Sequence, residues 1–212
     1  MPEPVSIDRD ALLGAQPSAT FIALFDSIAP SGVMEGDLAA MILSTPPLCR
    51  HIEWLMSRKL IHQDTLAGAN LKGANLRSAK LHGANLAGSN LMYADMYSAG
   101  MSFANLRDAD LRFSNLDHAN MFRSKMNRAK MKGVSMFAAN IQFANLSDAN
   151  IKDANLTLVD ASFVDASRAV LSNVNMASAN LYRSNFKGAS MRRVRLLGAN
   201  TEGSVMDLAP SP

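Results

Sequence analysis

Large apolar residues recur every five positions along the second part of the chain. The series runs from Leu66 to Met206, and its 29 centres comprise 14 Leu, 9 Met, 2 Ile and 1 Phe, with Ala161, Ala166 and Thr201 as exceptions. A period of five matches neither the 3.6-residue repeat of a helix nor the two-residue repeat of a strand. Because self-similarity at a fixed period is typical of stacked architectures, the pattern predicts a solenoid.

A small side chain stands two residues before each centre. Ala, Ser or Val fills 28 of these 29 positions, and only Asp64 departs from the rule. Residues i and i+2 of an extended segment point to the same side, so both can face inward if the chain turns once per unit. Asn occurs 15 times and Asp 4 times directly before a centre, and their side chains favour turns. The pattern predicts a narrow rod whose axis is filled by Leu and Met.

Glycine and proline fit the same scheme. Eight of the nine Gly in the repeat stand two residues after a centre, where a missing Cβ relieves strain at a turn. All eight Pro lie outside residues 48–209. We expect this absence because each coil must donate main-chain N–H groups to its neighbour.

Segments such as 69–73 (Ala-Asn-Leu-Lys-Gly), 104–108 (Ala-Asn-Leu-Arg-Asp) and 149–153 (Ala-Asn-Ile-Lys-Asp) resemble the pentapeptide-repeat family. The resemblance covers residues 64 to about 206 and implies a right-handed quadrilateral β-helix with four pentads per coil. The expected fold class is therefore mainly β, a solenoid of about seven coils with a small α-helical N-terminal cap. At ~4.8 Å between stacked strands, the rod would be roughly 34 Å long.

The first 63 residues have a different composition, with no Asn and six of the eight Pro. We expect a helical N-terminal cap or adaptor over 1–63, the β-helix over 64–206 and a flexible tail over 207–212. Helices are predicted over about 18–28, 35–43 and 48–61. A cap would shield the open end of the solenoid, whose unpaired main-chain groups invite aggregation. An adaptor that holds a second partner is the alternative.

Aromatic side chains avoid the centres. Of ten in the repeat, only Phe186 occupies one. If residues 20 apart stack, seven of the others form an outward strip that we predict to bind a partner: Phe103, Phe122, Phe143, Phe163 and Tyr182, with Tyr97 and Phe137 on the neighbouring face. An exposed apolar strip usually marks an interface. Two other interpretations stay open, namely cover by the N-terminal helices and ring stacking along the ladder.

The net charge of +3 averages two unlike parts. Residues 1–63 carry 4 basic and 7 acidic side chains, whereas residues 64–205 carry 17 and 10. The stacking rule predicts a basic patch of Lys125, Arg128, Lys130, Lys132, Arg192 and Arg193. This patch could bind an anionic partner, or it could be a solvated surface that only keeps the rod soluble. Since the main aromatic strip lies on another face, we do not expect a nucleic acid partner.

Candidate chemistry is sparse. The four His are scattered, Cys49 is the one cysteine, and Asp160 and Asp165 fit the ordinary turn position. We therefore expect no enzyme activity, no cofactor and no metal. No apolar run approaches the ~18 residues of a membrane helix, and the start lacks the features of a secretory signal. We expect a cytoplasmic protein, with secretion by a signal-independent route left open.

These observations predict a non-catalytic protein-interaction or scaffold module that presents an aromatic strip on a rigid β-helix. Its partner would be a protein of unknown identity, or a second copy in a homodimer. The resemblance implies one alternative, a DNA mimic that binds the topoisomerase DNA gyrase and gives resistance to its inhibitors. A secreted effector or a structural component of a larger assembly is the second alternative.

Overall fold

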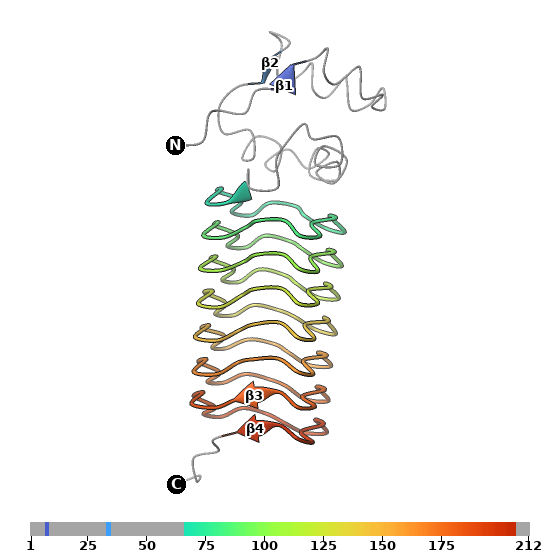
Figure 1. Cartoon of the computed structure of the whole chain (residues 1–212), viewed down its shortest axis with the longest axis vertical. Helices are drawn as coiled ribbons and strands as arrows, with labels where there is room; N and C mark the ends of the chain where they lie inside the picture. The colour runs from blue at the N-terminus through green and yellow to red at the C-terminus, as the bar shows by residue number, and fades with distance from the viewer. Residues whose placement is uncertain (1–6, 9–32, 35–65, 207–212) are drawn as a thin grey trace.

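The computed structural model describes residues 7–8, 33–34 and 66–206. The last range winds into a straight rod of stacked coils, coloured from green to red in Figure 1. At the C-terminal end of the rod, strands β3 (Asn185–Phe186) and β4 (Val205–Met206) pair in parallel. Near the N-terminus, β1 (Ile7–Asp8) and β2 (Val33–Met34) pair antiparallel. Within residues 66–206 the architecture is the right-handed quadrilateral β-helix that the repeat predicts.

Each coil of the rod contains twenty residues. Parallel bridges join the residue before one centre to the residue twenty positions further on, from Asn70 with Asn90 to Asn180 with Asn200. Twenty residues are four pentads, so the coil size implied by the resemblance is confirmed. Side chains whose numbers differ by twenty therefore lie one above the other along the rod.

The rod has four faces, which we number by their centres. Face 1 contains Leu66 and every twentieth residue after it, and faces 2, 3 and 4 start in the same way at Leu71, Leu76 and Leu81. Two turn residues follow each centre. They form corner 1, 2, 3 or 4, according to the face that they follow.

Every main-chain N–H group of a pentad can find a partner where Asn or Asp precedes the centre. In the pentad 91–95 the first, third and fifth residues donate to carbonyl oxygens of adjacent coils at 2.7, 3.1 and 2.9 Å. The fourth residue donates across the turn to the carbonyl of the first at 3.1 Å, and the second donates to Oδ1 of Asn90 at 3.2 Å. A proline at any of the five positions would remove one of these bonds, which explains why the rod contains none.

Asparagine and aspartate before the centre serve two purposes. Their Oδ1 atoms accept the N–H two residues on, as Asn115 does from Asp117 at 3.0 Å, which fixes the turn. Their side chains also bond along the rod, and Nδ2 of Asn185 donates to Oδ1 of Asp165 at 3.1 Å. The predicted turn role of these residues is confirmed.

Two layers of side chains fill the axis, namely the centres and the small residues two before them. Both sets are buried from Leu66 to Ala189. The core opens at the C-terminal end, where Met191, Val194 and Leu196 are only partly buried. The predicted helices over about 18–28, 35–43 and 48–61 and the tail over 207–212 lie outside the described residues, as does any cover that they give the rod.

Candidate functional site

A continuous stack of six rings runs along corner 4. Its members come from the two turn residues of successive coils, and we call them the ring ladder: His82, Phe103, Phe122, Phe143, Phe163 and Tyr182. Successive ring centroids are 5.3, 5.7, 5.6, 4.7 and 5.5 Å apart. All of these separations fall in the range of favourable aromatic pairs, so each ring is held by its neighbours above and below.

Ring orientation varies along the ladder. Phe143 and Phe163 are stacked with 2° between their planes, whereas the other steps are edge-to-face at 64° to 84°. Two guanidinium groups cover parts of the ladder. Cζ of Arg123 lies 5.3 Å from the centroid of Phe122 and 5.5 Å from that of Phe143, and Cζ of Arg183 lies 5.1 Å from that of Tyr182. These are cation–π contacts.

The ladder stays open to solvent although its rings stack. Phe103, Phe143 and Phe163 are exposed, with 44% of Phe143 accessible, and Phe122 and Tyr182 are half-buried. The rings therefore stack along the ladder, as one of the interpretations of the aromatic strip expected. Stacking covers only part of each ring, and the rest stays accessible to a partner. The outward direction predicted for all five strip residues on this side is confirmed.

Shorter stacks occupy two other corners. On corner 3 the rings of Tyr97, His118 and Phe137 follow one another at 5.3 and 5.6 Å, and Arg77 covers Tyr97 at 4.4 Å. The predicted residues Tyr97 and Phe137 thus lie in a separate stack, one corner away from the ring ladder. On corner 2, Tyr93 and Phe113 stack at 5.4 Å with 14° between planes.

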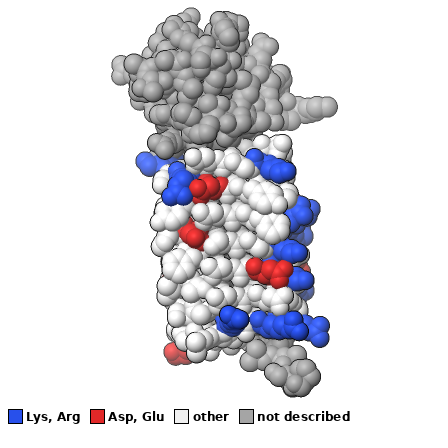
Figure 2. Space-filling view, turned by 180° about the vertical axis from the view of Figure 1, so that it is seen from behind, with Lys and Arg blue, Asp and Glu red and all other residues white. Residues whose placement is uncertain are grey.

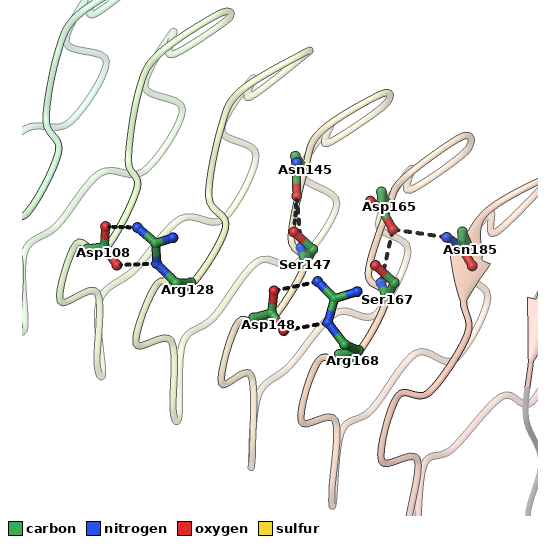
Figure 3. Close-up of polar contacts among 9 residues, drawn as sticks. All are labelled: Asp108, Arg128, Asn145, Ser147, Asp148, Asp165, Ser167, Arg168 and Asn185. Atoms are coloured by element: carbon green, nitrogen blue, oxygen red, sulfur yellow. Dashed lines mark hydrogen bonds and ion pairs between the residues drawn. The ribbon is translucent and has the colours of Figure 1, made fainter.

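Corner 1 carries ionic pairs instead of rings. The guanidinium of Arg128 donates two hydrogen bonds to the Asp108 carboxylate at 2.7 and 2.6 Å, and Arg168 binds Asp148 in the same way at 2.8 and 2.7 Å. Figure 3 shows the two pairs along the same edge of the rod. These hydrogen bonds lower the pKa of both carboxyl groups.

The predicted basic patch is spread over two faces and two corners. Lys130 lies on face 2, while Lys132, Arg192 and Arg193 lie on corner 2. Lys125 lies on face 1, and Arg128 on corner 1 is engaged with Asp108. The structure therefore brings five of the six predicted residues to face 2 and the corners that flank it, and leaves Lys125 on face 1.

Sequence reasoning missed several members of these stacks. His82 and His118 looked scattered, yet each stands one coil from an aromatic residue on the same corner. The ionic pairs join residues twenty apart, as in Asp148 and Arg168. A search for side chains at a separation of about twenty, once the coil size was known, would have found both.

No group of His, Cys, Asp or Glu within the described residues is arranged to hold a metal ion. Over the same part of the chain, no helix is long and apolar enough to cross a membrane. The features that distinguish the rod's surface are therefore its rings and its charges.

Comparisons with known proteins agree with this architecture. The family model for pentapeptide repeats matches in eight copies, over segments 69–102, 99–136, 114–157, 135–173, 154–193 and 169–206. No curated protein matches the chain.

Several solved structures are similar to the chain. HetL, a pentapeptide repeat protein involved in heterocyst differentiation regulation in the cyanobacterium Nostoc, is 26% identical over 65% of this chain and 76% of its own, with a TM-score of 0.31. Rfr23 from the cyanobacterium Cyanothece is 21% identical over 51% and 64%, with a TM-score of 0.30. QnrB1, a plasmid-mediated fluoroquinolone resistance protein, is 15% identical over 66% and 86%, with a TM-score of 0.35. The repeat model covers well over half of the sequence, and the chain belongs to the pentapeptide-repeat family.

Proposed function

We propose that this chain is a non-catalytic protein-interaction or scaffold module that holds a protein partner against the ring ladder of corner 4. The main observation behind this proposal is that three of the phenylalanines, Phe103, Phe143 and Phe163, remain exposed although their rings stack. Isolated exposed apolar residues are ordinary, whereas a contiguous exposed strip is a feature of binding surfaces.

The ladder also has the energetic features of a binding surface. Aromatic side chains supply large contact area and dominate interface hot spots. Because neighbouring rings already restrain Phe122 and Phe143, little side-chain entropy would be lost on binding. The adjacent guanidinium of Arg123 would add a directional polar group at the edge of the contact.

The proposal is tested by affinity capture of partners with the full chain and with Phe122→Ser/Phe143→Ser. This variant removes two adjacent rings from the middle of the ladder. We expect it to lose at least one protein that the unchanged chain retains, because contact area and the central rings are lost together.

Tyr93→Ser/Phe113→Ser is the matched control. It also removes two stacked, exposed rings, but from corner 2. We expect this control to keep the partner, and thermal melting should show that both variants are folded. Identical partner lists for the unchanged chain and Phe122→Ser/Phe143→Ser would rule out the ladder as the binding surface.

Gyrase binding by DNA mimicry would require a different surface charge on the rod. A DNA mimic would present a net acidic surface, whereas residues 66–206 carry 17 basic and 9 acidic side chains. We therefore prefer a partner that recognises the rings. A supercoiling assay with purified gyrase separates the two hypotheses, since inhibition or protection of the enzyme by the chain would favour the gyrase alternative.

A further inference from the structure

The excess positive charge of the rod lies on one side. Face 2 and the corners that flank it, 1 and 2, carry 11 basic and 4 acidic side chains. The remaining faces and corners of residues 66–206 carry 6 basic and 5 acidic ones, so they are almost neutral. Figure 2 shows Lys and Arg gathered mainly along one edge, beside a largely uncharged surface. We call face 2 with corners 1 and 2 the basic side.

Ion pairs neutralise part of the basic side and leave the rest available. The four carboxylates are Asp108, Asp110, Asp148 and Asp153, and each has a basic partner. Three of the pairs are short, at 2.6 to 2.7 Å, whereas Nζ of Lys132 is 3.8 Å from Asp153.

Other cations of the basic side make no ion pair within the described part of the chain. Five of them lie on face 2 or corner 2, namely Lys72, Lys130, Lys152, Arg192 and Arg193, and the other two, Arg107 and Lys187, lie on corner 1. Positive charge without an ion pair is therefore concentrated on face 2 and corner 2.

The strip between corners 1 and 2 is lined by short side chains over its C-terminal half. The outward residues of face 2 are Asn150, Val170 and Ser190, and all three are exposed. Longer cationic side chains stand on either side, such as Arg168 on corner 1 and Lys152 on corner 2. An extended chain could lie along this strip, with neutral groups below it and positive charge at its edges.

We propose that the basic side binds an extended acidic segment of a protein, on a surface separate from the ring ladder. Carboxylates lie between the cations of the basic side, and they favour a polypeptide over a uniformly charged polyanion. A polypeptide can place a neutral or basic residue opposite Asp110 or Asp153. Complementary charges of this kind fix the register of a complex. Duplex nucleic acid carries a negative charge every ~1.7 Å, so its backbone could not avoid these carboxylates.

Two further observations argue against other polyanions. Tyr93 and Phe113 are the aromatic residues of the basic side, and they stack on each other, which leaves no row of platforms for the bases of a single strand. A membrane surface would demand an apolar face beside the cations, whereas the strip is lined mainly by polar residues. The basic side runs over six coil steps of ~4.8 Å, or roughly 29 Å, which about nine residues of an extended acidic segment would span.

Fluorescence anisotropy with a labelled peptide of twelve glutamates tests the proposal on the full chain at low salt. We expect Lys130→Gln/Lys132→Gln/Lys152→Gln to weaken binding about tenfold, because each change removes a charge next to the peptide. The control Lys80→Gln/Lys125→Gln/Arg195→Gln removes the same charge from other faces, and we expect a loss below about threefold. Added salt should weaken binding by the unchanged chain.

Three results would overturn the proposal. One is the absence of binding to the glutamate peptide, and another is an equal loss in the two triple variants, which would mean that only total charge matters. The third is tighter binding of a twelve-base-pair DNA duplex, or of phosphatidylserine vesicles, with the same dependence on Lys130, Lys132 and Lys152. That outcome would reassign the basic side to nucleic acid or membrane.

Discussion

Residues two positions after a centre share a left-handed backbone throughout the rod. Twenty of them have side chains, with φ between 52° and 62°, and eight are glycines with φ between 66° and 71°. This conformation is unfavourable for residues with a Cβ, by roughly 1–2 kcal/mol. Hydrogen bonds between coils offset the cost, as when Phe103 N–H donates to the Phe122 carbonyl at 2.8 Å. The Phe and Tyr residues of the rod that are exposed all stand at this position, namely Tyr93, Phe103, Phe113, Phe143 and Phe163. Turn geometry and ring display are therefore linked.

Two glycines at this position allow the effect of a ring to be separated from backbone strain. A Cβ on Gly133 would lie 2.6 Å from the Phe113 ring, whereas one on Gly83 would meet nothing within 4 Å. Both residues have similar φ, +69° and +67°. We expect Gly133→Ala to lower the free energy of unfolding by about 0.5–1.5 kcal/mol more than Gly83→Ala, because the Phe113 ring must leave its stack.

Chemical denaturation of the two variants measures this difference. In a Phe113→Ala background the two glycine substitutions should become equivalent, since no ring then opposes the new Cβ. Equal losses with Phe113 present would show that the ring moves without cost.

Each corner of the rod acts as a separate element, because its side chains interact with residues twenty positions away. Corner 4 carries rings, and corner 1 alternates Asp108, Arg128, Asp148 and Arg168. Opposite charges one coil apart favour this register, since an arrangement that brought residues forty positions apart together would place Asp108 beside Asp148 and Arg128 beside Arg168. The ionic column therefore supports the alignment of the coils that the rings require.

The ionic column predicts a specific response to pH. The hydrogen bonds from Arg128 and Arg168 lower the pKa of Asp108 and Asp148 in the folded chain. Such carboxyl groups stabilise the fold above their unfolded pKa of about 3.9, and the effect disappears as the pH falls through the folded value. We expect Asp108→Asn/Asp148→Asn to melt at a lower temperature than the unchanged chain at pH 6, with the gap closing near pH 2.

Thermal melting across this pH range checks the prediction. Arg128→Gln/Arg168→Gln removes the other half of each pair and should give the same convergence. A gap that stays constant down to pH 2 would mean that these pairs do not contribute to stability.

At the scale of the whole molecule, the fold follows from the sequence more completely than the binding surfaces do. The five-residue period, the small residues beside each centre and the asparagines at the turns predict the rod because they recur locally in every pentad. The ladder from His82 to Tyr182 depends on which residues meet across coils, so it requires the twenty-residue register. The separation of Lys125 from the other predicted cations likewise depends on which face it occupies, which single pentads do not specify.

The central claim is that a partner contacts the ring ladder directly, and photo-crosslinking tests it most closely. Phe143 and Phe113 are matched sites, because their exposed fractions are 44% and 45% and both stand two residues after a centre. Replacing each in turn with a benzophenone analogue of phenylalanine, followed by irradiation in cell extract, should crosslink a protein at position 143 that is not crosslinked at position 113, where only a partner of the basic side would lie. The absence of an adduct at position 143, or the same adduct from both positions, would contradict the claim.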